Sequence, residues 1–403
     1  MIKKIIFLTP LILIIILSGI VLAADRDIKE KLLVDLFNLE DNLVTDLFDS
    51  SFLEQVPAGK VIEILDMYKS TLGSLKEVTT TEGGYTLVFE KGNAPATIVL
   101  NKDNQITGLQ FGMWTLTEDS ADRILAQFEE MAGAVSVCVI KDNQEILLDY
   151  NADQPLAVGS AFKLYILQAV YDQVRAGNIS WDSLLLINQE NKSFPSGILQ
   201  DWPVQTPLTV KTLTNLMISI SDNTATDHLL DYIGREKIEE YVPAVTKPFL
   251  KTVEAFKIKY SLEPERQGKY IRGDLAEKKD MLNELKDYEL DINQLVHDSP
   301  TLIEEVEWFF TTKELCKVIY ALRAAEELRI NPGLVEAAKW HIAGYKGGSE
   351  PGVLQYTHLL QKGQDDPVYA IAVTVNNPAD LVDSALVTEL TIRLISLIEQ
   401  GKL

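Results

Sequence analysis

The stretch Ala157-Val158-Gly159-Ser160-Ala161-Phe162-Lys163-Leu164 places a Ser-x-x-Lys motif at the start of a strongly apolar run. Apolar residues continue at helical spacing until Gly177, so a helix is expected to begin at Ser160. The backbone amides at a helix start point toward developing negative charge. Lys163 lies one turn along the same helix face, where an apolar pocket would lower its pKa and let it accept the serine proton. The motif also suits a serine N-cap followed by a surface lysine.

A second block, Ser221-Asp222-Asn223, falls between the helical runs 213–220 and 224–232. A serine between two helices can project its hydroxyl into a cleft and pass a proton to a leaving group. Asn223 can hydrogen-bond a substrate amide or the Lys163 ammonium. Capping of the next helix by Ser221 and Asp222 is also expected from these residue types, and the two roles are compatible.

A third block, Lys346-Gly347-Gly348, ends a late strand and is followed by Ser349. The two glycines would let a substrate backbone approach closely, and the Ser349 amide would be a second donor to an oxyanion. Lys346 would supply positive charge for a substrate carboxylate. Gly344 and Gly352 lie nearby, so a glycine turn between strands is the alternative.

In this order, the three blocks resemble the marks of the class A β-lactamase and penicillin-binding-protein superfamily, Ser-x-x-Lys, Ser-Asp-Asn and Lys-Thr/Ser-Gly. The resemblance covers residues 117–403 and implies a serine hydrolase with a β-lactamase/transpeptidase-like domain. The implied catalytic residues are Ser160, Lys163 and Ser221. The implied substrate-binding residues are Asn223, Lys346, Gly347, Gly348 and Ser349.

Three stretches resemble a narrower group of exported serine hydrolases, similar to the β-lactamase-like protein of clavulanic-acid gene clusters. They are residues 157–164, 195–202 and 345–352. In that group a steroid-isomerase-like α+β domain precedes the lactamase-like domain. The resemblance therefore implies such a domain at residues 26–115.

Two departures from the wider family bear on activity. Gly347 stands where the family has Thr or Ser, so a hydroxyl that helps hold a substrate carboxylate is missing, which argues against tight β-lactam binding. Class A enzymes also carry Glu-x-x-Leu-Asn, whose Glu activates the hydrolytic water, but Lys279 precedes Leu282-Asn283 here. Fast β-lactam hydrolysis by that route is not expected. Glu254, Glu263, Glu265 and Glu277 are candidates for a substitute base, and nothing in the sequence singles one out.

The N-terminal residues read as a targeting segment. Lys3 and Lys4 precede an apolar run over residues 5–21, and small residues follow at a cleavage position, so residues 1–23 are expected to be a secretory signal peptide. The run is nearly long enough to span a bilayer, and an uncleaved membrane anchor is the alternative. An extracytoplasmic location, periplasmic or secreted, follows from either reading.

The remaining periodicity predicts two folded domains. Residues 26–115 read as a small, cone-shaped α+β domain with a supporting or partner-binding role: helices at 27–48 and 57–68, then strands at 85–90, 96–100 and 106–111. Residues 117–403 read as an α/β domain, an antiparallel sheet flanked by helices, from strands at 135–140, 145–150, 341–346, 353–360 and 368–375. A helical insert separates the early and late strands. Its charged part, 261–307, suits a solvated excursion or a lid.

Composition narrows the partners. The 403 residues are 46% hydrophobic, which is enough for two hydrophobic cores. The net charge is −22, and no basic stretch follows residue 4, so nucleic acid is a poor candidate for a partner. Cys138 and Cys316 have apolar neighbours and are expected to be buried free thiols. The four histidines show no metal-ligand spacing, so neither a metal nor another cofactor is expected.

The sequence therefore predicts an exported serine hydrolase that acylates Ser160 with a small molecule. The substrate would be a β-lactam, an ester or a related amide, released by hydrolysis, with weak β-lactamase activity and a part in β-lactam breakdown. One alternative is a D-alanyl peptidase or penicillin-binding protein that acylates and stalls. Another is a non-catalytic binding protein with a vestigial cleft.

Overall fold

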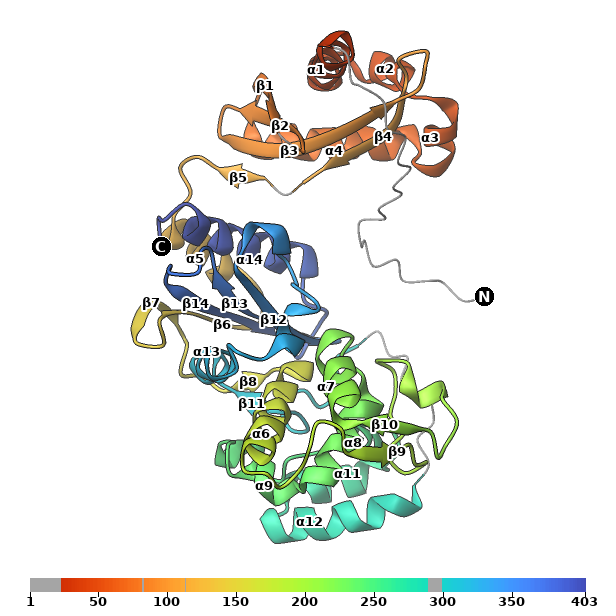
Figure 1. Cartoon of the computed structure of the whole chain (residues 1–403), viewed down its shortest axis with the longest axis vertical. Helices are drawn as coiled ribbons and strands as arrows, with labels where there is room; N and C mark the ends of the chain where they lie inside the picture. Colours follow the sequence, from red (N-terminus) through yellow and green to blue (C-terminus); the bar gives the residue numbers. More distant parts are fainter. Residues whose placement is uncertain (1–22, 82, 113, 289–298) are drawn as a thin grey trace. The chain divides into compact units, whose positions relative to one another are not determined.

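The computed structural model describes residues 23–403 except 82, 113 and 289–298. The predicted targeting segment therefore lies outside the described residues, apart from Ala23. The chain forms two compact units that adjoin in sequence at Glu118 and Asp119 (Figure 1). In the part of the chain that the structure describes, no helix combines the length and the apolar character needed to cross a membrane.

The first unit packs helices on one antiparallel sheet. Its helices are α1 (Ala23–Asn38), α2 (Asp41–Val44), α3 (Ser50–Gln55) and α4 (Ala58–Leu72). Its strands are β1 (Leu75–Thr81), β2 (Gly84–Phe89), β3 (Gly92–Leu100), β4 (Ile106–Phe111) and β5 (Thr115–Leu116), in the order β1-β2-β3-β4 with β5 on β3. The α+β character agrees with the sequence, and the steroid-isomerase-like relationship stays a prediction.

Two local expectations for this unit are wrong. The helix expected over 27–48 breaks after Asn38, which lets Val44 and Phe48 of the later turns join Phe37 in the same buried core. Strand β1 was not predicted, because its Thr-rich sequence lacks apolar alternation and its conformation comes from pairing with β2.

The second unit is built on a five-stranded antiparallel sheet. The strands are β6 (Ala134–Lys141), β7 (Glu145–Tyr150), β12 (Ile342–Glu350), β13 (Val353–Gln361) and β14 (Val368–Asn376), in the order β12-β13-β14-β6-β7. The early hairpin and the three late strands thus share one sheet, with β12 at an edge. The predicted antiparallel sheet flanked by helices is confirmed.

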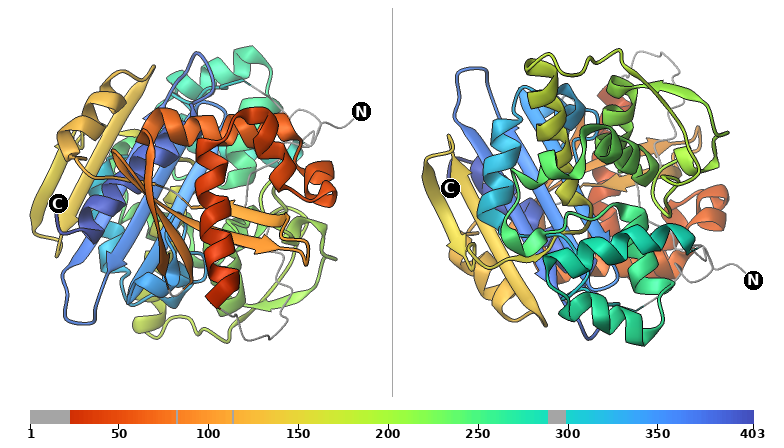
Figure 2. Two further views of the ribbon diagram at one scale, coloured as in Figure 1. Left: turned by 90° about the horizontal axis from the view of Figure 1, so that it is seen from above. Right: turned by 90° about the horizontal axis from the view of Figure 1, so that it is seen from below.

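Helices cover both faces of this sheet. Val137 and Val139 of β6 face the core formed with α5 (Ala121–Glu129) and α14 (Ser384–Glu399). Cys138 faces the opposite core, with α13 (Thr312–Ala321), which crosses that face in the right-hand view of Figure 2. This alternation follows the two-residue period of a strand. Cys316 of α13 is buried there too, and both thiols are free, as predicted.

Between the hairpin and the late strands the chain is mostly helical, as expected. The helices are α6 (Lys163–Arg175), α7 (Val210–Ser219), α8 (Asn223–Ile233), α9 (Arg235–Glu239), α10 (Thr252–Tyr260), α11 (Pro264–Arg272) and α12 (Leu275–Glu284). Two strand pairs were not predicted, because two or three residues are too few to show a period. They are β8 (Leu156–Ala157) with β11 (Phe309–Phe310), and β9 (Leu184–Leu186) with β10 (Pro207–Thr209).

The elements that carry the three motifs differ in detail from expectation. Ser160 lies in a 3₁₀ turn, η2 (Gly159–Phe162), and the α-helix begins only at Lys163. Strand β12 continues through the third block to Glu350, with Gly347 opposite Tyr356 of β13. The glycine-turn alternative is therefore wrong, because cross-strand pairing holds these glycines extended.

Candidate active site

The nucleophile segment and β12 approach each other so closely that only glycine fits at the contact. A Cβ on Gly348 would lie 2.5 Å from the Ser160 amide nitrogen, and a Cβ on Gly159 would lie 3.1 Å from that of Ser349. Gly159 also has φ +47°, which favours glycine. The amides of Ser160 and Ser349 therefore border the same backbone crossing, as an oxyanion site requires.

The Lys163 ammonium is buried among three acceptors. It donates to the Ser221 carbonyl at 2.6 Å, to Ser221 Oγ at 3.0 Å and to Asn223 Oδ1 at 2.7 Å. The predicted Asn223–Lys163 hydrogen bond is thus present, and the surface-lysine alternative is wrong because Lys163 is fully buried. Among the described residues the Ser160 hydroxyl has no hydrogen-bond partner.

Ser221 Oγ joins the first and third motifs. It accepts from Lys163 and also from the Lys346 ammonium, at 3.1 Å, and Lys346 donates further to the Gly347 carbonyl at 2.5 Å. A hydroxyl has two lone pairs. With both lone pairs engaged by lysine Nζ groups, the Ser221 proton is free for a third partner. Ser221 has φ +59°, a conformation that the α7–α8 junction imposes.

Lys163 and Lys346 are both buried next to Ser221 Oγ, and burial disfavours the protonated, charged form of each. Burial, followed by repulsion from the Lys346 ammonium, holds the pKa of Lys163 well below its usual range. Burial lowers the pKa of Lys346 to about 7. The neighbourhood therefore favours one neutral amine beside one ammonium at neutral pH, the state in which a lysine can act as a base.

A carboxylate behind the site fixes the loop that flanks it. Asp222 caps α8 by accepting from the Ala225 amide at 2.7 Å, and its other oxygen accepts from the amides of Ile198, at 2.7 Å, and Leu199, at 3.0 Å. The Asn223 side-chain amide donates to the Phe194 carbonyl at 2.9 Å. Sequence reasoning assigned Asp222 only the cap and missed this clamp, because the loop lies more than twenty residues upstream.

Replacing Gly197 by alanine is expected to weaken both the fold and the site. Gly197 has φ +108°, and a Cβ there would lie 2.6 Å from the Asp222 Cα. Left-handed strain and overpacking together should lower the free energy of unfolding by about 2–4 kcal/mol. Thermal denaturation measures the loss. Gly177→Ala is the control, because it has φ +75° but open space around it; an equal loss in both variants would show that backbone strain alone acts.

A second buried cluster holds the far end of β12. The Lys259 ammonium is fully buried and contacts Glu307 Oε1 at 2.5 Å and Glu350 Oε1 at 2.7 Å. Glu350 follows Ser349 directly, and Trp308, next to Glu307, stacks on Phe162 with ring centroids 3.9 Å apart. The cluster thus ties β12 to the segment around Ser160. No motif signalled it, because its members lie far apart in the sequence: Lys259 and Glu350 are separated by 91 positions.

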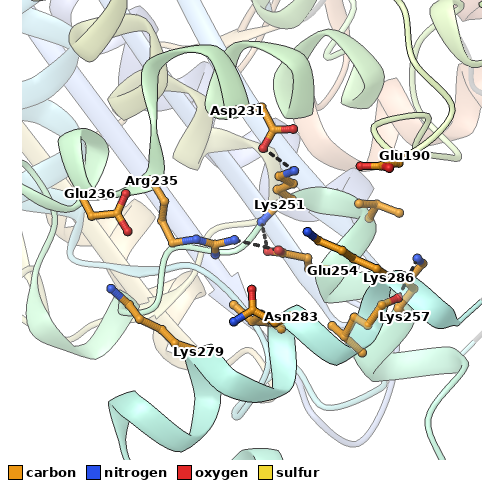
Figure 3. A pocket seen from close by; sticks show the side chains of 13 residues that line it. Glu190, Asp231, Arg235, Glu236, Lys251, Glu254, Lys257, Lys279, Asn283 and Lys286 are labelled. Atoms are coloured by element: carbon orange, nitrogen blue, oxygen red, sulfur yellow. Dashed lines mark hydrogen bonds and ion pairs between the residues drawn. The ribbon is translucent and has the colours of Figure 1, made fainter.

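The carboxylates considered as hydrolytic bases have other partners. Glu254 pairs with Arg235 at 2.7 Å and caps α10. Lys279 pairs with Glu239 at 3.2 Å. Glu254, Lys279 and Asn283 line a charged pocket of about 410 Å³ (Figure 3). None of the eight predicted site residues lines this pocket.

The other three candidate carboxylates lie at helix starts. Glu263 occupies the N-cap position of α11 and Glu265 its first turn, and Glu277 completes a capping box with Asp274 in α12. The hydrogen bonds of Lys163 go to serine and asparagine oxygens. Within the described ranges, no three Asp, Glu, His or Cys side chains are arranged to hold a metal ion.

All eight predicted site residues thus meet at one junction of η2, the α7–α8 connection and β12. The β-lactamase enzyme family model matches residues 117–273. The β-lactamase VEB-1 of Pseudomonas aeruginosa is 28% identical over 114 residues, which are 27% of this chain and 38% of that protein. The chain therefore aligns with less than half of this curated relative's length. Both matches make part of the second unit similar in sequence to β-lactamases.

Solved structures of β-lactamases are also similar. The β-lactamase from Sphaerobacter thermophilus is 20% identical, with a TM-score of 0.48, over 70% of this chain and 97% of that one. The class A β-lactamase from Mycobacterium abscessus is 15% identical, with a TM-score of 0.47, over 70% and 98%. The narrower resemblance to the clavulanic-acid group stays a prediction.

Proposed function

We propose that this protein is a serine hydrolase that is acylated at Ser160 by a β-lactam, an ester or a related amide, and that it has weak β-lactamase activity. One observation supports this most: the Lys163 and Lys346 ammonium groups converge on Ser221 Oγ beside the paired amides of Ser160 and Ser349. A nucleophile, a base, a proton donor and an oxyanion site are then all within one junction.

In the proposed acylation, neutral Lys163 takes the Ser160 proton and Oγ attacks the substrate carbonyl carbon. The amides of Ser160 and Ser349 stabilise the resulting oxyanion. Ser221 donates its proton to the leaving group as the carbonyl–leaving-group bond breaks, and Lys163 or Lys346 reprotonates Ser221. Asn223 and Lys346 position the substrate.

Deacylation is the step that the site residues support less well. Water must lose a proton as it attacks the acyl carbon, and Lys163 is the base that the described geometry offers. A D-alanyl peptidase or penicillin-binding protein that acylates and stalls is the second candidate function. The pairing of Lys279 with Glu239, where a class A enzyme would carry its activating Glu, favours it.

We also propose an extracytoplasmic location, supported by the apolar run at residues 5–21 behind two lysines. A steroid-isomerase-like first unit with a supporting role is part of the same proposal. The only partner that it requires is a small-molecule substrate.

Intact-mass measurement after incubation with nitrocefin, benzylpenicillin and p-nitrophenyl esters tests the function. A covalent adduct on the peptide containing Ser160 is expected from at least one probe. Its decay over time separates the two candidates, because a hydrolase returns to its original mass whereas a stalling protein keeps the acyl group. Absence of any adduct, with no probe consumed, would contradict both.

A further inference from the structure

One buried ammonium, that of Lys259 near the end of α10, contacts carboxylates from two different segments. It lies 2.5 Å from Glu307 Oε1 and 2.7 Å and 2.9 Å from the two carboxylate oxygens of Glu350. The side chains of Lys259 and Glu307 are almost fully buried, whereas that of Glu350 is 15% exposed. Burial alone would lower the pKa of Lys259, but the two carboxylates outweigh burial and raise this pKa, so the amine stays charged.

Glu307 connects this ammonium to the nucleophile segment. The carbonyl of the next residue, Trp308, accepts from the Val158 amide at 3.1 Å, and the Trp308 ring stacks on Phe162. Val158 lies two residues before Ser160, and Phe162 lies two residues after it. Trp308 therefore contacts the chain on both sides of the residue whose amide borders the crossing with β12.

Glu350 connects the same ammonium to β12. It is the last residue of the strand and directly follows Ser349, whose amide is the second donor of the proposed oxyanion site. Strand β12 lies at the edge of the sheet and pairs with β13 alone among the described strands. The chain then turns at Gly352, which has φ +81°. The contact with Lys259 thus fixes the end of an edge strand just before this turn.

We propose that Lys259 is a positioning residue of the oxyanion site. Through two carboxylates its ammonium anchors the two segments that supply the Ser160 and Ser349 amides, and it thereby sets the separation of these amides. This inference rests on the proposed function, because the separation matters to the reaction only if an oxyanion forms between the amides. Donors stabilise an oxyanion only at hydrogen-bonding distance, so a small shift of one segment slows acylation.

Glu350→Gln tests the β12 side of this anchor, because it keeps the shape of the side chain and removes its charge. Burial, followed by repulsion from Glu307, raises the pKa of Glu350. The variant leaves Lys259 and Glu307 as a balanced ion pair, so the melting temperature should be kept. We expect acylation by benzylpenicillin to slow about 10-fold, with the loss in the acylation rate constant and not in the dissociation constant of the noncovalent complex. Quenched-flow kinetics read by intact mass separate these two constants.

Glu307→Gln tests the nucleophile side and should slow acylation to a similar extent. Asp119→Asn is the matched control, because Asp119 pairs with Arg393 of α14 at 2.8 Å and both side chains are 4% exposed. This control should lower the melting temperature, since it leaves a buried guanidinium without its partner, but keep the acylation rate constant within about 2-fold. If the rate constants of all three variants instead followed their melting temperatures, general destabilisation would explain them and the positioning role would be lost.

Crystal structures of the wild type and of Glu350→Gln give a readout that does not depend on acylation. The separation of the Ser160 and Ser349 amide nitrogens should differ by about 0.5 Å or more, the tolerance of a preorganised site. Equal separations would overturn the proposal, and so would acylation at the wild-type rate in both glutamine variants. A changed separation without any Ser160 adduct in the wild type would support the anchoring and count against the proposed function.

Discussion

Replacing Ser160 by alanine is expected to abolish covalent labelling and to lower turnover by about 10⁶-fold, the loss typical of removing a serine nucleophile. The reason is chemical: Ser160 carries the nucleophilic hydroxyl of the proposed reaction, and its amide lies at the crossing of η2 and β12 together with that of Ser349. Intact mass with benzylpenicillin and a p-nitrophenyl ester measures labelling, and absorbance measures turnover.

Ser349→Ala is the control for this variant. It removes a neighbouring hydroxyl but keeps the amide that the oxyanion site uses, so labelling should remain within a few-fold of wild type. Equal rates for wild type and Ser160→Ala on every substrate would contradict the hydrolase proposal and favour a binding protein with a vestigial cleft.

Replacing Lys163 by methionine is expected to slow acylation by about 10²–10⁴-fold, the usual contribution of a general base. The apolar stem is retained, so the loss reports the amine. Acylation by the wild type should rise with pH as Lys163 loses its proton, and the low folded-state pKa places this rise well below the titration of a free lysine. Stopped-flow acylation rates across the pH range give the profile.

Lys346→Met tests the cause of that profile. Removing the neighbouring charge should raise the pKa of Lys163, since repulsion from Lys346 is second only to burial among the causes of its lowering. The rise of the profile should therefore move to higher pH in this variant. An unchanged profile would show that Lys163 does not titrate as the base. Since the two lysines interact, each apparent pKa belongs to the pair.

The sequence predicted those helices and strands whose own residues show a strong local pattern. Strands 145–150 and 106–111 were predicted with the bounds that the structure has, because each is an apolar run closed by turn residues. Strand β1 and the four short strands β8, β9, β10 and β11 were not predicted, because pairing with a partner strand, rather than their own residues, makes them extended.

The sequence by itself determined the chemistry on offer: a serine, two lysines, a second serine and an asparagine in three short motifs, whose order implied their roles. Only the tertiary structure decided how they meet. The pairing of β12 with β13 keeps Gly348 against the Ser160 amide, and burial brings Lys163 and Lys346 to one hydroxyl. These contacts join residues that are far apart in the sequence. They depend on close backbone approach and on burial, and neither can be predicted from the local spacing of apolar residues.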